Sequence, residues 1–169
     1  MSIRKLPRVN TKSIAFVFML LASCGYHIRG TVDLPEALRK VYLAGASPLL
    51  REQFSKSLKT SSGEVVNSAS KAGMVIQVLN ERMDRRVLSL SNTGKANEFE
   101  LNYSLDFQLL DAKGEVLLDR QTIEISRDYF NDQEAIIAKT NEEAVIKTEM
   151  YQQAVRSIVD RARAYLTAK

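Results

Sequence analysis

The residue types that perform chemistry in enzymes do not form a catalytic pattern in this sequence. The chain has a single histidine, His27, and no Cys, Asp or Glu at a spacing that would make it a metal ligand or general base. No Ser-His-Asp set, HExxH sequence or glycine-rich phosphate loop occurs. Two carboxylate pairs, Glu98 with Glu100 and Glu142-Glu143, suit the polar side of a strand and the start of a helix. We therefore expect no enzymatic activity, no cofactor and no metal.

The single cysteine, Cys24, ends a segment that is typical of a secretory signal peptide. Four basic residues precede an apolar run, Ser13–Ala22, which is too short to be an ordinary transmembrane helix. Leu21-Ala22-Ser23-Cys24 resembles a bacterial lipobox, in which the thiol receives a diacylglyceryl group, the chain is cut before the cysteine, and the new amino group is acylated. We expect residues 1–23 to be removed and residues 24–169 to form one lipid-anchored domain. The alternative is a secreted protein in which Cys24 is incidental.

The residue after the cysteine bears on the membrane to which the lipid would attach. Two or three acyl chains anchor a protein stably, whereas one chain binds only marginally. In lipoproteins of Gram-negative bacteria an Asp after the cysteine commonly signals retention in the inner membrane, and here that residue is Gly25. We therefore expect an outer-membrane protein whose domain lies on the periplasmic side.

The net charge argues against nucleic acid as a partner. The full chain has 24 Lys and Arg against 20 Asp and Glu, a formal net charge of +4. Four of the basic residues and none of the acidic residues lie within residues 1–23, so residues 24–169 carry 20 of each. A neutral domain lacks the electrostatic signature of a nucleic-acid-binding protein.

Apolar periodicity predicts strands in the first part of the domain and a long helix at its end. Ser47-Pro48 predicts the start of a helix of about 13 residues that ends at Gly63. Phe99–Leu109 alternates apolar and polar residues, which indicates a half-buried strand, and the turns at Ser91–Lys95 and Asp111–Gly114 predict antiparallel neighbours. The predicted strands are 26–29, 40–44, 74–90, 98–109 and 116–127.

Near the C-terminus the apolar period changes to that of a helix. Apolar residues recur at spacings of three and four from Ala144 to Tyr165, and Asn141-Glu142-Glu143 predicts the helix start. Such a stripe either covers a sheet or meets a coiled-coil partner, and we favour the sheet. The predicted fold class is α+β, with two helices, one of them long and C-terminal, on one face of a mixed, mainly antiparallel sheet of about four strands.

Two segments resemble the LptE family of lipopolysaccharide-assembly lipoproteins. Cys24–Gly30 resembles the start of the mature proteins of that family, and Tyr129–Asp132 with Ala138-Lys139 and Lys147–Tyr151 resembles the segment that leads into their last helix. The order of elements also agrees over nearly the whole domain. One departure is that a basic residue before the glycine of the hairpin turn is replaced here by Asn92-Thr93.

The resemblance implies an outer-membrane lipoprotein that binds lipopolysaccharide, acts as a plug within the β-barrel LptD and assists assembly of that barrel. Binding of lipid A phosphates requires cations beside apolar surface. The candidate cations are Lys95, Lys139, Arg82, Arg85 and Arg86, of which Lys139 is supported mainly by the resemblance. For Arg82, Arg85 and Arg86 the alternative is a solvated strand face, or a sheet edge that charge protects from pairing.

Two other functions stay open on the sequence alone. A lipoprotein that pilots or stabilises a different outer-membrane complex would share the anchor and the fold class. A periplasmic hydrolase would require a clustered acid-base or nucleophile site, which the sequence does not show.

Overall fold

A computed structural model of the protein describes residues 34–131 and 136–168, with side chains described for 34–131 and 142–168. The predicted signal peptide, Cys24 and the predicted strand at 26–29 lie outside the described residues. The elements, in chain order, are α2 (Glu36–Arg39), β1 (Lys40–Ala44), α3 (Pro48–Thr60), β2 (Glu64–Val65), the 3-10 turn η1 (Ala69–Lys71), β3 (Met74–Leu90), β4 (Ala96–Leu110), β5 (Val116–Phe130) and α4 (Ile136–Thr167).

The described strands form a mixed sheet in the order β2-β1-β3-β4-β5. β1 is parallel to both β2 and β3, whereas β3, β4 and β5 form an antiparallel meander. The α+β class is confirmed, but the expected strand count of about four was one too low. The added strand is β2, whose two residues pair with β1 and are followed by a hydrogen bond from Val66 N to Val41 O of 2.9 Å. Two residues give no readable periodicity, so this strand is hidden in the sequence.

β3 is much longer than its parallel neighbour. β1 pairs with β3 only from Val41–Met74 to Ala44–Gln77, so beyond Gln77 one edge of β3 lacks a partner strand among the described residues. Gly45 makes the departure of β1 possible. Its φ is +76°, and a Cβ at this position would lie 2.7 Å from the carbonyl oxygen of Val78. The register of β3 against β4 also shifts between Val78 and Asn80, just after the point where β1 separates from β3.

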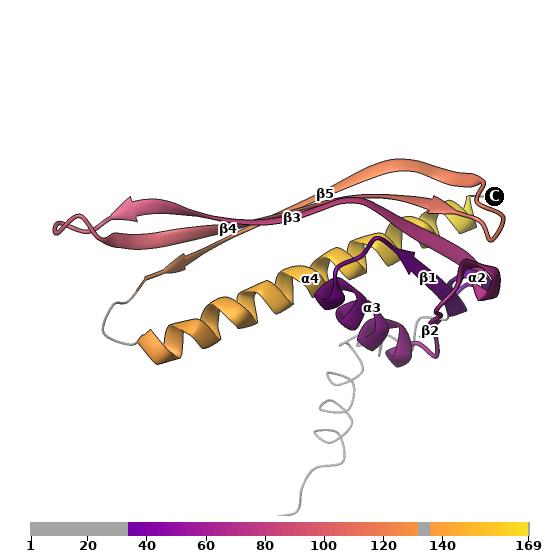
Figure 1. Cartoon of the computed structure of the whole chain (residues 1–169), viewed down its shortest axis with the longest axis horizontal. Helices are drawn as coiled ribbons and strands as arrows, with labels where there is room; N and C mark the ends of the chain where they lie inside the picture. The colour runs from indigo at the N-terminus through magenta and orange to yellow at the C-terminus, as the bar shows by residue number, and fades with distance from the viewer. Residues whose placement is uncertain (1–33, 132–135, 169) are drawn as a thin grey trace, which may run out of the picture. The chain divides into compact units, whose positions relative to one another are not determined.

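The two faces of the long meander differ in character. On β4 the odd-numbered residues from Leu101 to Leu109 are buried, and α3 and α4 lie on the same side of the sheet (Figure 1). We call this helix-covered side the inner face and the opposite side the outer face. The predicted alternation of β4 is confirmed, and its apolar half forms one core with both helices.

α4 covers the inner face with the apolar stripe that the sequence predicted. Its residues Met150, Tyr151, Val155 and Ile158 are buried, and the ring of Tyr151 lies 4.7 Å from that of Tyr103 on β4, centroid to centroid.

The predicted start of α4 at Asn141 was wrong, because the helix begins at Ile136. Residues 136–140 contain neither Gly nor Pro, so no helix-breaking residue prevents the helix from extending from Asn141 back to Ile136. Glu142 and Glu143 are therefore in the second turn of the helix and not at its cap.

We expect Gly45→Ala to lower the free energy of unfolding by about 2–4 kcal/mol, because it adds a clash with the Val78 carbonyl to the strain of a positive φ. Gly94→Ala is the matched control. Gly94 has a φ of +75° but no atom within 4 Å of an added Cβ. Its substitution should therefore lower the free energy of unfolding by only about 1–2 kcal/mol. Urea denaturation measures both values, and equal losses would show that the close approach of Gly45 to Val78 does not matter.

Candidate functional site

The three candidate arginines of β3 lie on different faces of the sheet. In the β3–β4 register Arg85 is opposite Leu101, a buried residue of the inner face, whereas Arg86 is opposite Glu100. Because side chains alternate along a strand, Arg82 and Arg86 lie on the outer face and Arg85 on the inner face. The structure therefore separates residues that adjoin one another in the sequence.

On the outer face both guanidinium groups pair with carboxylates. Arg86 forms two contacts with Glu100, of 2.5 Å from Nε to Oε2 and 3.1 Å from Nη2 to Oε1. Arg82 lies 2.5 Å from Asp84, Nε to Oδ2. The hydrogen bond from Arg86, followed by one from Asn102, holds the pKa of the Glu100 carboxyl below its usual range. This half of β3 is also the edge without a neighbour, and charges on such an edge discourage pairing with another strand.

On the inner face Arg85 belongs to a cluster that joins β3, β5 and α4. The carboxylate of Glu143 on α4 accepts hydrogen bonds from Arg85 Nη1 at 3.1 Å and from the hydroxyl of Tyr129 at 2.6 Å, both at Oε2. Its other oxygen, Oε1, lies 2.6 Å from Lys147 Nζ one helical turn further on. The guanidinium of Arg85 stacks 4.7 Å above the ring of Phe99. We call these five residues the Glu143 cluster.

The electrostatics of the cluster favour an ionised Glu143. Hydrogen bonds from Lys147, Tyr129 and Arg85 lower the pKa of Glu143 to about 2, against the opposing effect of burial. The pKa of Tyr129 is raised, first by burial and then by its hydrogen bond to Glu143. The pKa of Arg85 is raised by its hydrogen bonds to Tyr129 and Glu143. The cluster therefore ties the start of α4 to the sheet with fully charged groups.

Lys95 lies at the tip of the β3–β4 hairpin and is exposed. The turn is closed by hydrogen bonds from Ser91 N to Lys95 O at 2.7 Å and from Gly94 N to Ser91 O at 2.9 Å. Within the described part of the chain, no carboxylate forms an ion pair with Lys95. Lys139 lies in the first turn of α4, and its side chain is outside the described residues.

Exposed apolar side chains gather at the same end of the sheet as Lys95. Leu90, the last residue of β3, is 64% exposed, and Phe130, the last residue of β5, is 68% exposed. Asn131 connects this end of β5 to the hairpin, since its backbone N–H donates to the carbonyl of Asn97 at 2.7 Å. We call Leu88, Leu90, Lys95 and Phe130 the hairpin tip. The sequence analysis identified the lysine but not the exposed apolar residues at this end of the sheet, of which Phe130 comes from another strand.

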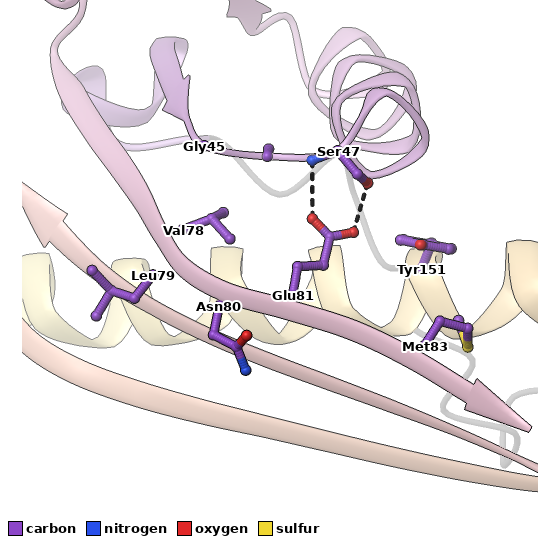
Figure 2. A pocket seen from close by; sticks show the side chains of 9 residues that line it. Gly45, Ser47, Val78, Leu79, Asn80, Glu81, Met83 and Tyr151 are labelled. Carbon is purple, nitrogen blue, oxygen red and sulfur yellow. Dashed lines mark hydrogen bonds between the residues drawn. The ribbon is translucent and has the colours of Figure 1, made fainter.

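A pocket of about 480 Å³ lies where β1 leaves β3, and its polar centre is Glu81. Figure 2 shows the Glu81 side chain pointing from β3 towards the start of α3, where its carboxylate accepts hydrogen bonds from Ser47 N at 2.9 Å and Ser47 Oγ at 2.6 Å. The predicted N-cap is confirmed, because Ser47 Oγ accepts from Leu50 N at 3.2 Å. No local pattern in the sequence pointed to Glu81, which is 34 residues from Ser47. Its contacts serve to join α3 to β3.

The described residues contain neither a metal-binding cluster nor a helix that could span a membrane. No group of three or more His, Cys, Asp and Glu side chains is placed to hold a metal ion in this part of the chain. No helix within the described ranges is both long enough and apolar enough to cross a membrane.

Glu143→Gln should lower the free energy of unfolding by about 1–3 kcal/mol at pH 7, because it removes an ionised partner of three donors. The pKa of Glu143 is lowered on folding from 4.5 to about 2, so its contribution is fully present above about pH 4.5. The contribution is lost as the pH falls towards 2, so the difference between the variant and the parent should shrink over that range.

Urea denaturation between pH 7 and pH 3 measures this difference. The control is Glu124→Gln, which changes an exposed carboxylate that forms no ion pair within the described residues. The interpretation is wrong if the effect of Glu143→Gln is the same at pH 7 and pH 3.

Comparison with known proteins places the chain in a family. The model of the family "LptE: Lipopolysaccharide-assembly" matches residues 37–162. Proteins named LPS-assembly lipoprotein LptE from Photorhabdus laumondii and Pectobacterium atrosepticum are 25% and 26% identical to this chain. The first alignment covers 90% of this chain and 84% of the relative, and the second covers 90% and 83%.

Solved structures agree with this assignment. A lipoprotein B from Nitrosomonas europaea is 32% identical with a TM-score of 0.69, and the match covers 85% of this chain and 94% of that one. The rare lipoprotein B from Shewanella oneidensis is 25% identical with a TM-score of 0.61, over 76% of this chain and 97% of that one. The family model covers most of the described domain, and the chain therefore belongs to the LptE family of lipopolysaccharide-assembly lipoproteins, whose role is not enzymatic.

Proposed function

We propose that this lipopolysaccharide-assembly lipoprotein binds lipopolysaccharide directly at the hairpin tip and acts as a plug and assembly factor within the outer-membrane barrel LptD. The observation that carries the ligand proposal is that Lys95, Leu90 and Phe130 are all exposed at the same end of the sheet. Family membership supports a role in lipopolysaccharide assembly, and the tip supplies the surface that such a ligand requires.

The chemistry of the hairpin tip matches lipid A, which presents phosphates attached to acyl chains. The ammonium group of Lys95 can form a charge-assisted hydrogen bond with a phosphate oxygen. Burial of apolar surface stabilises association by about 25 cal/mol per Å², so Leu88, Leu90 and Phe130 supply the second part of the binding energy. Lys139, in the first turn of α4, is proposed as a further cation on the same ligand.

The outer face suits a polar partner such as the interior of a β-barrel. No described helix covers this face of β3, β4 and β5 (Figure 1), and its β4 residues are mostly polar, as Glu100, Asn102 and Ser104 illustrate. The interiors of outer-membrane barrels are polar, in contrast to their lipid-facing exteriors. The uncovered outer face therefore supports the proposed contact with LptD.

We also propose that Cys24 carries the diacylglyceryl and N-acyl groups that hold the domain to the outer membrane. The lipobox-like Leu21-Ala22-Ser23-Cys24 supports this assignment. Three acyl chains would provide a stable anchor without a membrane-spanning segment.

We expect the double variant Lys95→Ala, Lys139→Ala to bind purified lipopolysaccharide about tenfold more weakly, which corresponds to about 1.4 kcal/mol. Titration calorimetry measures the affinity, and an unchanged urea midpoint confirms that the fold is kept. Lys113→Ala is the matched control, because Lys113 is an exposed lysine in the β4–β5 hairpin turn. Unchanged affinity in the double variant would remove both lysines from the binding site.

Purification of the full-length protein from outer membranes tests the partner and the anchor. We expect one large β-barrel in stoichiometric amount and a lipidated Cys24 peptide in mass spectrometry. Cys24→Ser should abolish fatty-acid incorporation and release the protein from the membrane fraction. Recovery of a different outer-membrane complex would replace LptD by that partner, and an unmodified Cys24 would exclude the anchor.

A further inference from the structure

Three hydrogen-bond donors, two of them cationic, converge on the single carboxylate of Glu143, and this arrangement resembles an occupied anion site. We propose that Arg85, Lys147 and Tyr129 form a second phosphate-binding site, in which the Glu143 carboxylate is displaced by a phosphate of lipopolysaccharide. The identity of the ligand rests on the function proposed above. The site itself rests on the geometry of the Glu143 cluster, which lies on the inner face and is distinct from the hairpin tip.

The donors surround Glu143 in a way that suits an oxyanion. Arg85 Nη1 and the Tyr129 hydroxyl share Oε2, at 3.1 and 2.6 Å, while Lys147 Nζ binds Oε1 at 2.6 Å. A phosphate group offers at least three oxygens, so it can accept from all three donors with one oxygen each.

One of the two cations, Arg85, keeps a contact that does not involve Glu143. Arg85 stacks on the ring of Phe99 at 4.7 Å, and that ring contacts the ring of Tyr129 at 5.6 Å between centroids. Lys147 is on α4, whose position is fixed by its buried stripe further along the helix. Displacement of the carboxylate therefore leaves Arg85 stacked on Phe99 and the backbone of Lys147 fixed, which reduces the entropy lost on binding a new anion.

The charge of the site favours phosphate over the carboxylate that now occupies it. Arg85 and Lys147 together carry two positive charges, of which Glu143 neutralises one. A phosphate monoester carries about −1.5 to −2 at neutral pH and therefore matches both cations. Arginine also binds phosphate in a bidentate manner, for which its planar guanidinium is well suited.

The site is open to a large ligand. The side chains of Arg85 and Lys147 are 52% and 36% exposed, so neither needs to be uncovered. Val87 follows Arg85 on the same face of β3, opposite Phe99, and is 49% exposed. An apolar residue beside the cations is what an acylated phosphate requires.

Competition with Glu143 would weaken binding, because the ligand must displace an anion that is already in place. The apparent dissociation constant equals the intrinsic one divided by the fraction of molecules in which the site is open. Loose binding suits a protein that passes its ligand on. It follows that removing the competing carboxylate should strengthen binding.

The test is the affinity of full-length Glu143→Gln for purified lipopolysaccharide, measured by titration calorimetry. We expect an increase of about five- to tenfold over the parent, and no increase for the same lipopolysaccharide after removal of its phosphates. Adding Arg85→Gln to Glu143→Gln should cancel the gain. The matched control is Glu100→Gln, which frees Arg86 on the outer face, where no second cation shares the carboxylate among the described residues. This control should leave the affinity unchanged.

The inference is overturned if folded Glu143→Gln shows no gain, or if Glu100→Gln gains as much. If Glu143→Gln does not fold, the Lys147→Gln variant of the parent protein decides. It should weaken binding about threefold, whereas Lys113→Gln should not weaken it.

Inorganic phosphate is titrated in parallel. A gain for phosphate without a gain for lipopolysaccharide would overturn the lipid assignment. If the parent protein binds no lipopolysaccharide at all, the proposed function fails, and the phosphate titration still decides whether the anion site exists.

Discussion

The packing of β4 against α4 is the contact on which the rest of the described domain depends. Tyr103 and Leu105, at the centre of β4, are buried beneath the helix stripe that includes Tyr151 and Ile158. Side chains on a strand alternate between faces, so a slip of one residue would bury Glu100 and its polar neighbours in place of this apolar set. The packing therefore fixes the register of β4. Through the hydrogen-bonded ladders it also decides which side chains of β3 and β5 face the helices.

Elements with strong local signals could be predicted from the sequence, and elements that depend on distant partners could not. The alternation of β4 and the Ser47-Pro48 helix start were predicted because both signals lie within a few residues. The pairing of Glu81 with Ser47 was missed, since it joins residues 34 positions apart. The helix start was misplaced at Asn141, because a good capping residue was present while the residues before it were also able to form helix.

In the candidate site, too, the sequence shows which residue types are present but not which residues the fold brings together. The sequence indicated which cations could meet a phosphate, but Arg85 and Arg86 are adjacent and carry the same charge. Only the register against β4 separates them, and only the path of α4 brings Glu143 to Arg85, a residue 58 positions earlier. Periodicity shows that side chains alternate along a strand. In a largely polar strand, as β3 is beyond Leu79, it does not show whether the odd-numbered or the even-numbered residues face the helices.

The outer face carries more negative than positive charge, and this bears on where an anionic ligand can bind. Over the meander from Asn80 to Phe130, the described residues of that face include six carboxylates and three guanidinium groups. They are Asp84, Glu98, Glu100, Asp106, Glu124 and Asp128, with Arg82, Arg86 and Arg120. Each guanidinium is paired with a carboxylate, so a phosphate approaching this face meets a net negative charge. By contrast, Lys95 at the hairpin tip forms no ion pair within the described residues, and in the Glu143 cluster two cations share one carboxylate. These charges support the proposals that an anionic ligand binds at the tip and in the Glu143 cluster, and that the outer face meets a polar or cationic protein surface.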